Sequence, residues 1–254
     1  MNSLISKLSI AIAGVASLLM FSWPLFITSN ISTEATTAQT VFILLMPLTL
    51  VIVLIEFATG DISSKHLALL GVLIALNAVI RLLGAGTAGI ETAFFLVILG
   101  AYVFGSGFGF ILGAGSIFVS ALLTGGIGPW LPFQMMGAAL IGLGAGLIPH
   151  AAKKWLEKLN LIVYSVIASF TYGALMTLWN WPYLAGTGTQ ISYVAGAPLV
   201  DNLTKFLQYE IVTGGLIWDT GRAITTSVLI LLTGSALIAT LSRAATRAGV
   251  GRKL

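Results

Sequence analysis

The chain has no cysteine, few charged residues and no recognisable catalytic motif. Without cysteine it has no disulfide framework, no thiolate metal site and no cysteine nucleophile. Eight acidic and twelve basic residues among 254 positions cannot cover a water-facing surface. The composition therefore excludes a soluble enzyme, a nucleic-acid-binding protein and a disordered chain.

Catalytic and nucleotide-binding patterns are also missing. The chain contains no HExxH, no GxxxxGK[ST] and no paired carboxylate cluster. Its two histidines, His66 and His150, stand at the ends of separate apolar runs and do not make a metal site. We therefore expect a protein that is not an enzyme and has no cofactor or metal. It cannot drive uphill transport by its own ATP hydrolysis, so the energy must come from elsewhere.

What the chain does have is long apolar runs. Hydrophobic residues make up 57% of the sequence, and runs of roughly 20 apolar residues cross a bilayer as helices, because every backbone amide must be satisfied inside the hydrocarbon. The sequence predicts an all-α membrane protein with about eight transmembrane helices. The predicted spans are Leu8–Thr28, Val41–Ala58, Leu67–Leu83, Thr92–Phe104, Phe108–Leu123, Leu131–Pro149, Leu159–Leu178 and Gly215–Leu241.

Two of these runs need interpretation. The residues Gly105-Ser-Gly separate the fourth run from the fifth, and a tight glycine turn between two short helices is favoured over one long span. The first run follows Lys7 and has the outline of a signal peptide. It is long and contains Trp23-Pro24, so we interpret it as a retained helix.

The positive charges predict the orientation. With the N-terminus in the cytoplasm, nine basic residues fall inside and three outside, as the positive-inside rule requires. Both termini are then cytoplasmic, and we expect a multi-pass protein of a bacterial plasma membrane. The inner residues are Lys7, Lys65, Lys153, Lys154, Lys158, Arg243, Arg247, Arg252 and Lys253, and the outer residues are Arg81, Lys205 and Arg222.

A few charges lie in or near the membrane, where they need partners or water. Arg81 stands about one turn inside the outer end of the third span. It either contributes to a site or extends to the outer headgroups. Asp219 and Arg222 are three residues apart, close enough to pair along a helix. The pair is either structural or in contact with a ligand, and both remain open.

Aromatic residues gather on the same outer side. Trp130 follows a glycine-rich loop, and Trp179-Asn-Trp-Pro-Tyr183 ends the seventh span. Interfacial belts are the usual reason for tryptophan and tyrosine at this depth. The segment 181–213 is harder to explain in this way, because loops of such length are commonly lids or binding loops. Within it, Leu203 to Ile211 predicts a short amphipathic helix on the surface.

Small residues recur at helical spacing. Gly105, Gly109 and Gly113 are four residues apart, and Gly142 and Gly146 repeat this spacing, which favours close internal helix packing. In the third span, Gly71 and Ala75 form a similar pair. This second pair fits a partner helix as well as a neighbouring one.

From Leu67 to Leu241 the order of features resembles the substrate-binding S component of energy-coupling-factor (ECF) vitamin transporters. The resemblance implies a six-helix core over 67–241, preceded by two extra N-terminal helices within 1–60. The unit 61–242 then includes the outer loop 181–213, and 243–254 is a basic cytoplasmic tail. The residues that carry the resemblance are Gly71-xxx-Ala75-Leu-Asn-Ala-Val-Ile-Arg81, Tyr102-Val-Phe-Gly-Ser-Gly-Phe-Gly109, Gly128-Pro-Trp-Leu-Pro-Phe-Gln-Met135 with Gly142-xxx-Gly146, Trp179-Asn-Trp-Pro182 and Trp218-Asp-Thr-Gly-Arg222.

The resemblance also implies partners and a site. An S component captures a vitamin or related micronutrient outside the cell and associates with a transmembrane scaffold and two cytoplasmic ATPases. The scaffold docks on small-residue motifs of the first core helices, here Gly71 and Ala75. The ligand pocket lies at the outer ends of the last helices. In this chain it maps to Trp130, Gln134, Trp179, Asn180, Trp181, Tyr183, Trp218, Asp219 and Arg222, to which we add Arg81.

The substrate is less defined by the sequence. The metal-transporting branch uses an N-terminal histidine, and Met1-Asn-Ser-Leu has none, which disfavours nickel and cobalt. Six tryptophans, a long outer loop and the extra helices suggest a bulky, cobalamin-like ligand, followed by thiamin-like or other aromatic vitamins. The principal alternative is an ion-coupled secondary transporter or channel that uses Arg81, Asp219 and Arg222. A membrane enzyme ranks third, because no catalytic constellation is present.

Overall fold

The computed structural model describes residues 11–26 except 13, 16 and 20, together with 64–84, 90–184, 188–194 and 196–249. All regular structure in these residues is helical, which confirms the predicted all-α class. The predicted span Val41–Ala58 lies outside them, as does the side chain of Tyr183. The eight helices are α2 (Trp23–Phe26), α4 (Ser64–Gly84), α5 (Phe95–Phe104), α6 (Ser106–Thr124), α7 (Leu131–Ala145), α8 (Lys154–Leu184), α9 (Leu199–Val212) and α10 (Gly215–Ala248).

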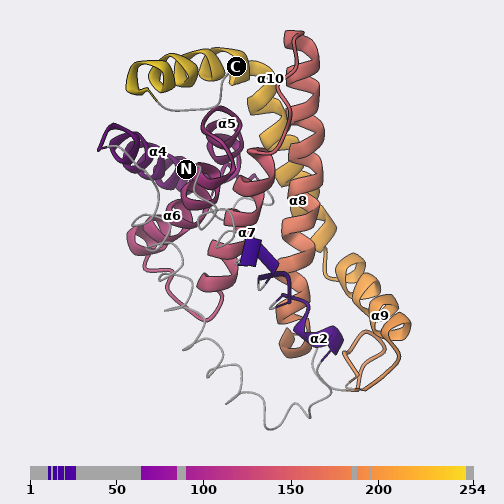
Figure 1. Ribbon diagram of the computed structural model, residues 1–254. Coiled ribbons are helices and arrows are strands. Elements are labelled where there is room, and N and C mark those ends of the chain that lie inside the picture. Colours follow the sequence, from indigo (N-terminus) through magenta and orange to yellow (C-terminus); the bar gives the residue numbers. More distant parts are fainter. Residues whose placement is uncertain are drawn as a thin grey trace.

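Four of these helices, α4, α6, α8 and α10, are long and apolar enough to cross a membrane. In Figure 1, α8 and α10 run side by side along one flank of the bundle, α4 and α6 form the other flank, and α5 and α7 lie between them. The amphipathic α9 lies at one end of α8, and the C-terminal end of α10 lies at the opposite end of the bundle.

The last helix is longer than the predicted span. It continues past Leu241 to Ala248, so Arg243 and Arg247, which we assigned to a separate tail, belong to its last turns. Alanine and arginine are good helix formers, so nothing in that segment interrupts the backbone hydrogen bonds. The helix ends at Gly249, whose φ of 70° is the left-handed conformation that terminates many helices.

The short helix α5 forms the centre of the bundle. All ten of its residues are buried, and it contacts α6, α7 and α10. Gly105, with φ of 102°, turns the chain directly from α5 into α6. This positive φ is readily adopted only by glycine. The predicted glycine turn between two separate helices is confirmed, although only α5 is short and α6 has 19 residues.

Helices α6 and α7 cross at glycines. A Cβ atom added to Gly109 would meet the backbone carbonyl of Gly142, and one added to Gly113 would meet that of Ala138. A Cβ on Gly146 would meet the backbone of Ser106 at the start of α6. The structure therefore confirms the predicted internal packing, because the two backbones approach too closely for any side chain at these positions.

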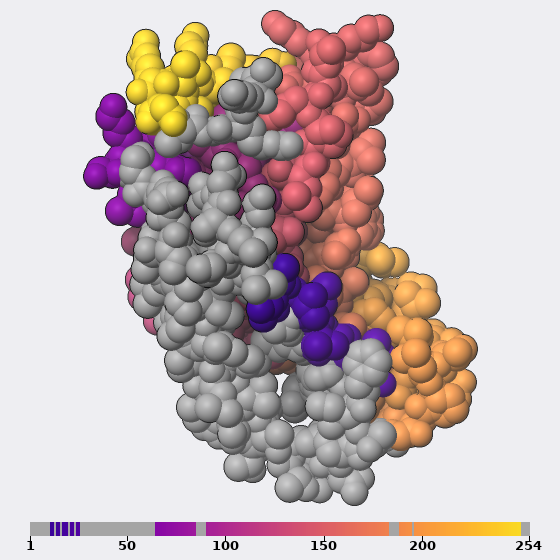
Figure 2. All heavy atoms as spheres, viewed as in Figure 1, coloured from indigo at the N-terminus to yellow at the C-terminus, as the bar shows by residue number. Residues whose placement is uncertain are grey.

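The described part of the first predicted span packs against the core. Phe21 is buried, and its ring lies 5.7 Å from that of Phe133 on α7. Leu18 adjoins a small apolar cavity between α7 and α8. Figure 2 shows these indigo N-terminal residues lying across the pink and orange helices of the core.

The segment between α8 and α10 folds onto the side of α8. Trp181, Tyr193, Phe206 and Tyr209 form a small buried group, which we call the outer aromatic cluster. Trp181 is fully buried there, and its indole nitrogen donates a hydrogen bond to the Ile191 carbonyl at 2.9 Å. The expected amphipathic helix is present as α9, somewhat longer than the predicted Leu203 to Ile211.

The glycine crossing gives a first prediction. Gly109→Ala should destabilise the protein by about 1–3 kcal/mol, because the added methyl group overlaps a backbone that cannot rotate away. The measurement is the midpoint of thermal unfolding of the purified protein in detergent.

Gly71→Ala provides the matched control on α4, since no heavy atom lies within 4 Å of a Cβ added at Gly71. This change should leave the unfolding midpoint unchanged or raise it, because alanine favours a helix more than glycine does. Equal unfolding midpoints for the two variants would contradict the close crossing.

Candidate functional site

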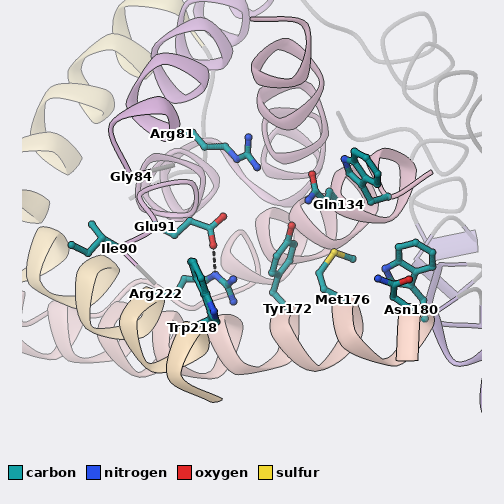
Figure 3. A pocket seen from close by; sticks show the side chains of 12 residues that line it. Arg81, Gly84, Ile90, Glu91, Gln134, Tyr172, Met176, Asn180, Trp218 and Arg222 are labelled. Carbon is teal, nitrogen blue, oxygen red and sulfur yellow. Dashed lines mark hydrogen bonds and ion pairs between the residues drawn. The ribbon is translucent and has the colours of Figure 1, made fainter. Parts of the chain in front are cut away.

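A cavity of about 400 Å³ opens at the end of the bundle where α4 and α8 end and α10 begins. It contains an unusual concentration of polar groups for this apolar protein, and Figure 3 shows several of them pointing into the same space. Its lining residues are Arg81, Gly84, Ile90, Glu91, Trp130, Gln134, Tyr172, Met176, Trp179, Asn180, Trp218 and Arg222.

Arg222 is at the centre of a buried network of charges. Its Nε lies 2.5 Å from a carboxylate oxygen of Glu91, and its NH1 atom lies 2.7 Å from one of Asp219. NH1 also donates a hydrogen bond to the backbone carbonyl of Ser169 at 3.2 Å. Two carboxylates thus hold one guanidinium, and the Glu91 pairing is the dashed line in Figure 3. Such pairing is what makes a buried arginine tolerable.

Aromatic rings complete the surroundings of this guanidinium. Its carbon atom lies 5.0 Å from the centroid of the Tyr172 ring and 5.7 Å from that of Phe94. These two rings pack edge to face with centroids 4.7 Å apart. Cation–π attraction therefore adds to the ion pairs and restricts Arg222 to one position in the cavity wall.

Arg81 is held differently from Arg222. Its NH1 donates a hydrogen bond of 2.8 Å to the hydroxyl of Ser120, whereas its Nε is buried and has no hydrogen-bond partner within the described residues. No carboxylate in that part of the chain lies within 4 Å of it. Figure 3 shows its guanidinium directed into the cavity. Arg81 is therefore a cation with unused hydrogen-bonding capacity inside the cavity.

The tryptophans of the cavity differ in burial. Trp179 is buried, and its ring stacks on Phe133 with a centroid distance of 3.9 Å and an interplanar angle of 6°. Trp130 and Trp218 are 46% and 48% exposed. One wall of the cavity is thus packed in place, while the two other rings retain exposed surface that a ligand can cover.

Most of the predicted site residues line this one cavity. Trp130, Gln134, Trp179, Asn180, Trp218, Arg222 and Arg81 all do so. Asp219 is buried behind Arg222 and does not line the cavity, so its contact is with the arginine. Tyr183 lies outside the described side chains.

Trp181 lies elsewhere than predicted. It is in the outer aromatic cluster, and none of the described residues of 188–213 lines the cavity. Helix geometry accounts for this difference, because residues two positions apart point about 200° from each other. Trp179 faces the cavity, so Trp181 on the same helix points away from it. The expectation that this segment covers the ligand pocket is therefore not met by its described residues.

The sequence reading missed five lining residues, Gly84, Ile90, Glu91, Tyr172 and Met176. Helical spacing could have found two of them, because Tyr172, Met176, Trp179 and Asn180 follow the i, i+4, i+7, i+8 pattern of one helix face. No local pattern singled out Glu91, since its partner Arg222 is 131 positions away.

No group of three or more histidine, cysteine or acidic side chains that could hold a metal occurs among the residues that the structure describes. The cavity can instead bind an organic molecule, because Arg81, Gln134 and Asn180 can form hydrogen bonds with it and the aromatic rings give it an apolar surface.

The charge network generates a second prediction. Arg222→Met should cost about 3–5 kcal/mol of stability, because it leaves Glu91 and Asp219 close together without their common cation. The thermal unfolding midpoint in detergent measures this change. Lys154→Met, an exposed position on α8, should have little effect.

A triple variant with Glu91→Gln, Asp219→Asn and Arg222→Met should recover much of the lost stability, because it leaves no buried charge. A single Arg222→Met variant as stable as the parent protein would show that the network is not formed.

Comparison with known proteins identifies the family of the chain. The family described as "ECF transporter, substrate-specific component" matches residues 65–232, which include every helix from α5 to α9, nearly all of α4 and about half of α10. No curated protein and no solved structure matches the chain. The match covers more than half of the chain, so the protein belongs to the substrate-specific components of ECF transporters, which are transport subunits of the membrane.

Proposed function

We propose that the chain captures a small, ring-bearing organic anion in the cavity around Arg81 and delivers it across the membrane with partner subunits. The observation that carries the proposal is the combination of an arginine without a carboxylate partner among the described residues with three tryptophans in one cavity. Stacking rings and a few convergent polar groups are typical of sites for small organic molecules.

The size of the cavity argues for a compact substrate. Cavities of roughly 300–1,000 Å³ hold drug-sized ligands, and about 400 Å³ lies near the lower end of that range. A cobalamin-like corrinoid, which the tryptophan content suggested, is far larger than such ligands. A smaller vitamin or related micronutrient with one ring system fits the space better.

The charge balance argues for an anionic substrate. Arg222 is already neutralised by Glu91 and Asp219, so it has little capacity left for a ligand charge. Arg81 lines the cavity and gives one NH1 hydrogen bond to Ser120, and a carboxylate or phosphate is the group that best uses the other N–H donors at the end of its guanidinium. We therefore assign Arg81 to the ligand's anionic group and the tryptophans to its ring.

Delivery needs partners, because the sequence has no nucleotide-binding motif. Membership of the family supports a transmembrane ECF scaffold and two cytoplasmic ATPase subunits as those partners. Gly71 and Ala75 are exposed on α4, and no heavy atom lies within 4 Å of a Cβ added at Gly71. Exposed apolar side chains surround them, including Val72, Leu76 and Val79. This face of α4 suits close approach of a scaffold helix.

The distribution of charge supports the orientation. The end of the bundle opposite the cavity includes six described basic residues, and the cavity therefore faces outside if the positive-inside rule holds. We propose a plasma-membrane location with both termini in the cytoplasm. The six residues are Lys65, Lys153, Lys154, Lys158, Arg243 and Arg247.

The third prediction concerns ligand binding. The purified chain should bind one member of a panel of water-soluble vitamins with submicromolar affinity, detected by quenching of tryptophan fluorescence. Arg81→Ala should weaken that binding by roughly 10- to 100-fold, the value of a hydrogen bond to a charged group. Two pairs of probes test whether the anionic group of the ligand is recognised, because the members of each pair differ in charge. They are biotin with biotinamide and nicotinate with nicotinamide.

Two controls accompany this measurement. Arg81→Lys should retain part of the affinity, and Lys205→Ala should retain all of it, because Lys205 does not line the cavity. An Arg81→Ala variant with unchanged affinity would contradict the assignment of the anion. Absence of binding for every vitamin of the panel would contradict the proposed function.

The fourth prediction concerns the scaffold. A variant with Gly71→Leu and Ala75→Leu should no longer co-purify with co-expressed scaffold and ATPase subunits, because bulky side chains prevent close helix approach. Its ligand affinity should equal that of the parent chain, since both positions are far along α4 from the cavity. An intact complex would show that the docking surface lies elsewhere.

The purified chain also distinguishes a binding subunit that depends on ATPases from an ion-coupled secondary transporter. Vesicles that contain the chain alone should not accumulate the ligand under an ion gradient. Accumulation in such vesicles would establish the alternative and exclude the dependence on ATPases.

A further inference from the structure

A second cavity lies at the opposite end of the bundle from the proposed ligand site. It has a volume of about 720 Å³ and is formed by the first turns of α4 and the last turns of α10. We call it the basic cleft. Figure 2 shows the yellow end of α10 next to the purple α4 at one corner of the molecule. Its lining residues are Lys65, Ala68, Leu69, Thr240, Arg243, Ala244, Arg247 and Ala248.

The cleft is formed by one stripe of each helix. Lys65, Ala68 and Leu69 follow the i, i+3, i+4 spacing on α4. On α10, positions 240, 243, 244, 247 and 248 follow the same spacing over two turns. The principal neighbours of α10 as a whole are α8 and α5.

All charges of the basic cleft have the same sign. Lys65, Arg243 and Arg247 are its only ionisable lining residues within the described part of the chain. The ion pairs among the described residues all belong to Arg222, so none of these three cations has a carboxylate of a described residue within 4 Å. Arg243 donates one hydrogen bond to the hydroxyl of Thr240 at 3.2 Å. Because like charges gathered in one cleft repel one another, such a group favours an anion among them.

Helix dipoles account for only part of this arrangement. Arg243 and Arg247 lie in the last turns of α10, where a cation is favourable beside the partial negative charge of the helix end. Lys65 is in the first turn of α4, where a cation is unfavourable for the same reason. The dipoles therefore do not explain why a third cation lies across the cleft from the other two.

The uncharged surface of the cleft is largely apolar. The methyl groups of three alanines and the side chain of Leu69 line the cleft together with the cations. The cleft also lies at the ends of two helices that are apolar enough to span a membrane. A ligand for this place therefore has an anionic head and an apolar body, which is the chemistry of a lipid at the membrane interface.

We propose that the basic cleft binds the phosphate of an anionic phospholipid. The phosphate lies among Lys65, Arg243 and Arg247, and the acyl chains extend along the apolar sides of α4 and α10. Basic pockets between membrane helices bind phospholipid headgroups in this way, with roughly a fivefold gain in affinity for each cation near the surface. The site does not depend on the ligand of the outer cavity.

The test is a lipid titration of the purified full-length chain in a neutral detergent, monitored by native mass spectrometry. The parent chain should bind one phosphatidylglycerol molecule at least tenfold more tightly than phosphatidylcholine. A variant with Lys65→Gln, Arg243→Gln and Arg247→Gln should lose on the order of 100-fold of the phosphatidylglycerol affinity. The variant with Arg243→Lys and Arg247→Lys should keep most of it, because it keeps the charges.

A matched control removes three other basic residues from the same end of the bundle, Lys153, Lys154 and Lys158, by substitution with glutamine. This control should bind phosphatidylglycerol as the parent does. An equal loss in both triple variants would overturn the proposal, because it would show attraction by net charge alone.

Inorganic phosphate is added as a competitor in a separate titration. Displacement of the lipid by phosphate at similar concentration would show a site for the free ion and would also overturn the proposal. Thermal unfolding midpoints show whether each variant is folded.

Discussion

The ion-paired guanidinium of Arg222 is the constraint on which the cavity depends. It joins three segments that are far apart in the sequence: Glu91 before α5, the Ser169 carbonyl on α8, and Asp219 on α10 itself. In an apolar bundle, an arginine without these partners would be very costly. The network therefore holds the three segments in one arrangement and leaves the ring of Tyr172 and the guanidinium of Arg81 facing the same space.

The two arginines of the cavity have different roles because their partners differ. Arg222 is saturated by carboxylates and stabilises the fold, whereas Arg81 has only the Ser120 hydroxyl as a described hydrogen-bond partner. The proposed site, with one neutralised and one available cation, would favour an anion without being strongly positive itself. The opposite end of the bundle carries the basic cleft, so the proposed substrate site and the proposed lipid site lie at opposite ends of the molecule.

Much of the fold was predictable from the sequence, because long apolar runs in a bilayer have few alternatives to a helix. The turn at Gly105 and the crossing at Gly109 were also predictable, since each requires a residue without a side chain. The end of α10 was not, because a run of alanine and arginine after Leu241 continues a helix as readily as it begins a tail.

The predicted residues of the candidate site are mainly aromatic, charged or amide side chains near helix ends, and helical spacing could have added Tyr172 and Met176 within α8. Trp179 and Trp181 look equivalent in the sequence, yet helix geometry directs only one of them into the cavity. Glu91 could not be found, because only tertiary structure brings it to Arg222.

The most direct test of this account is an experimental density map of the purified chain with the ligand that it retains. The account predicts density for a single compact molecule among Trp130, Trp179 and Trp218, with its anionic group within about 4 Å of the Arg81 guanidinium, the distance of an ion pair. A cavity closed by the chain's own side chains, or an Arg81 paired with a carboxylate of the protein, would contradict it.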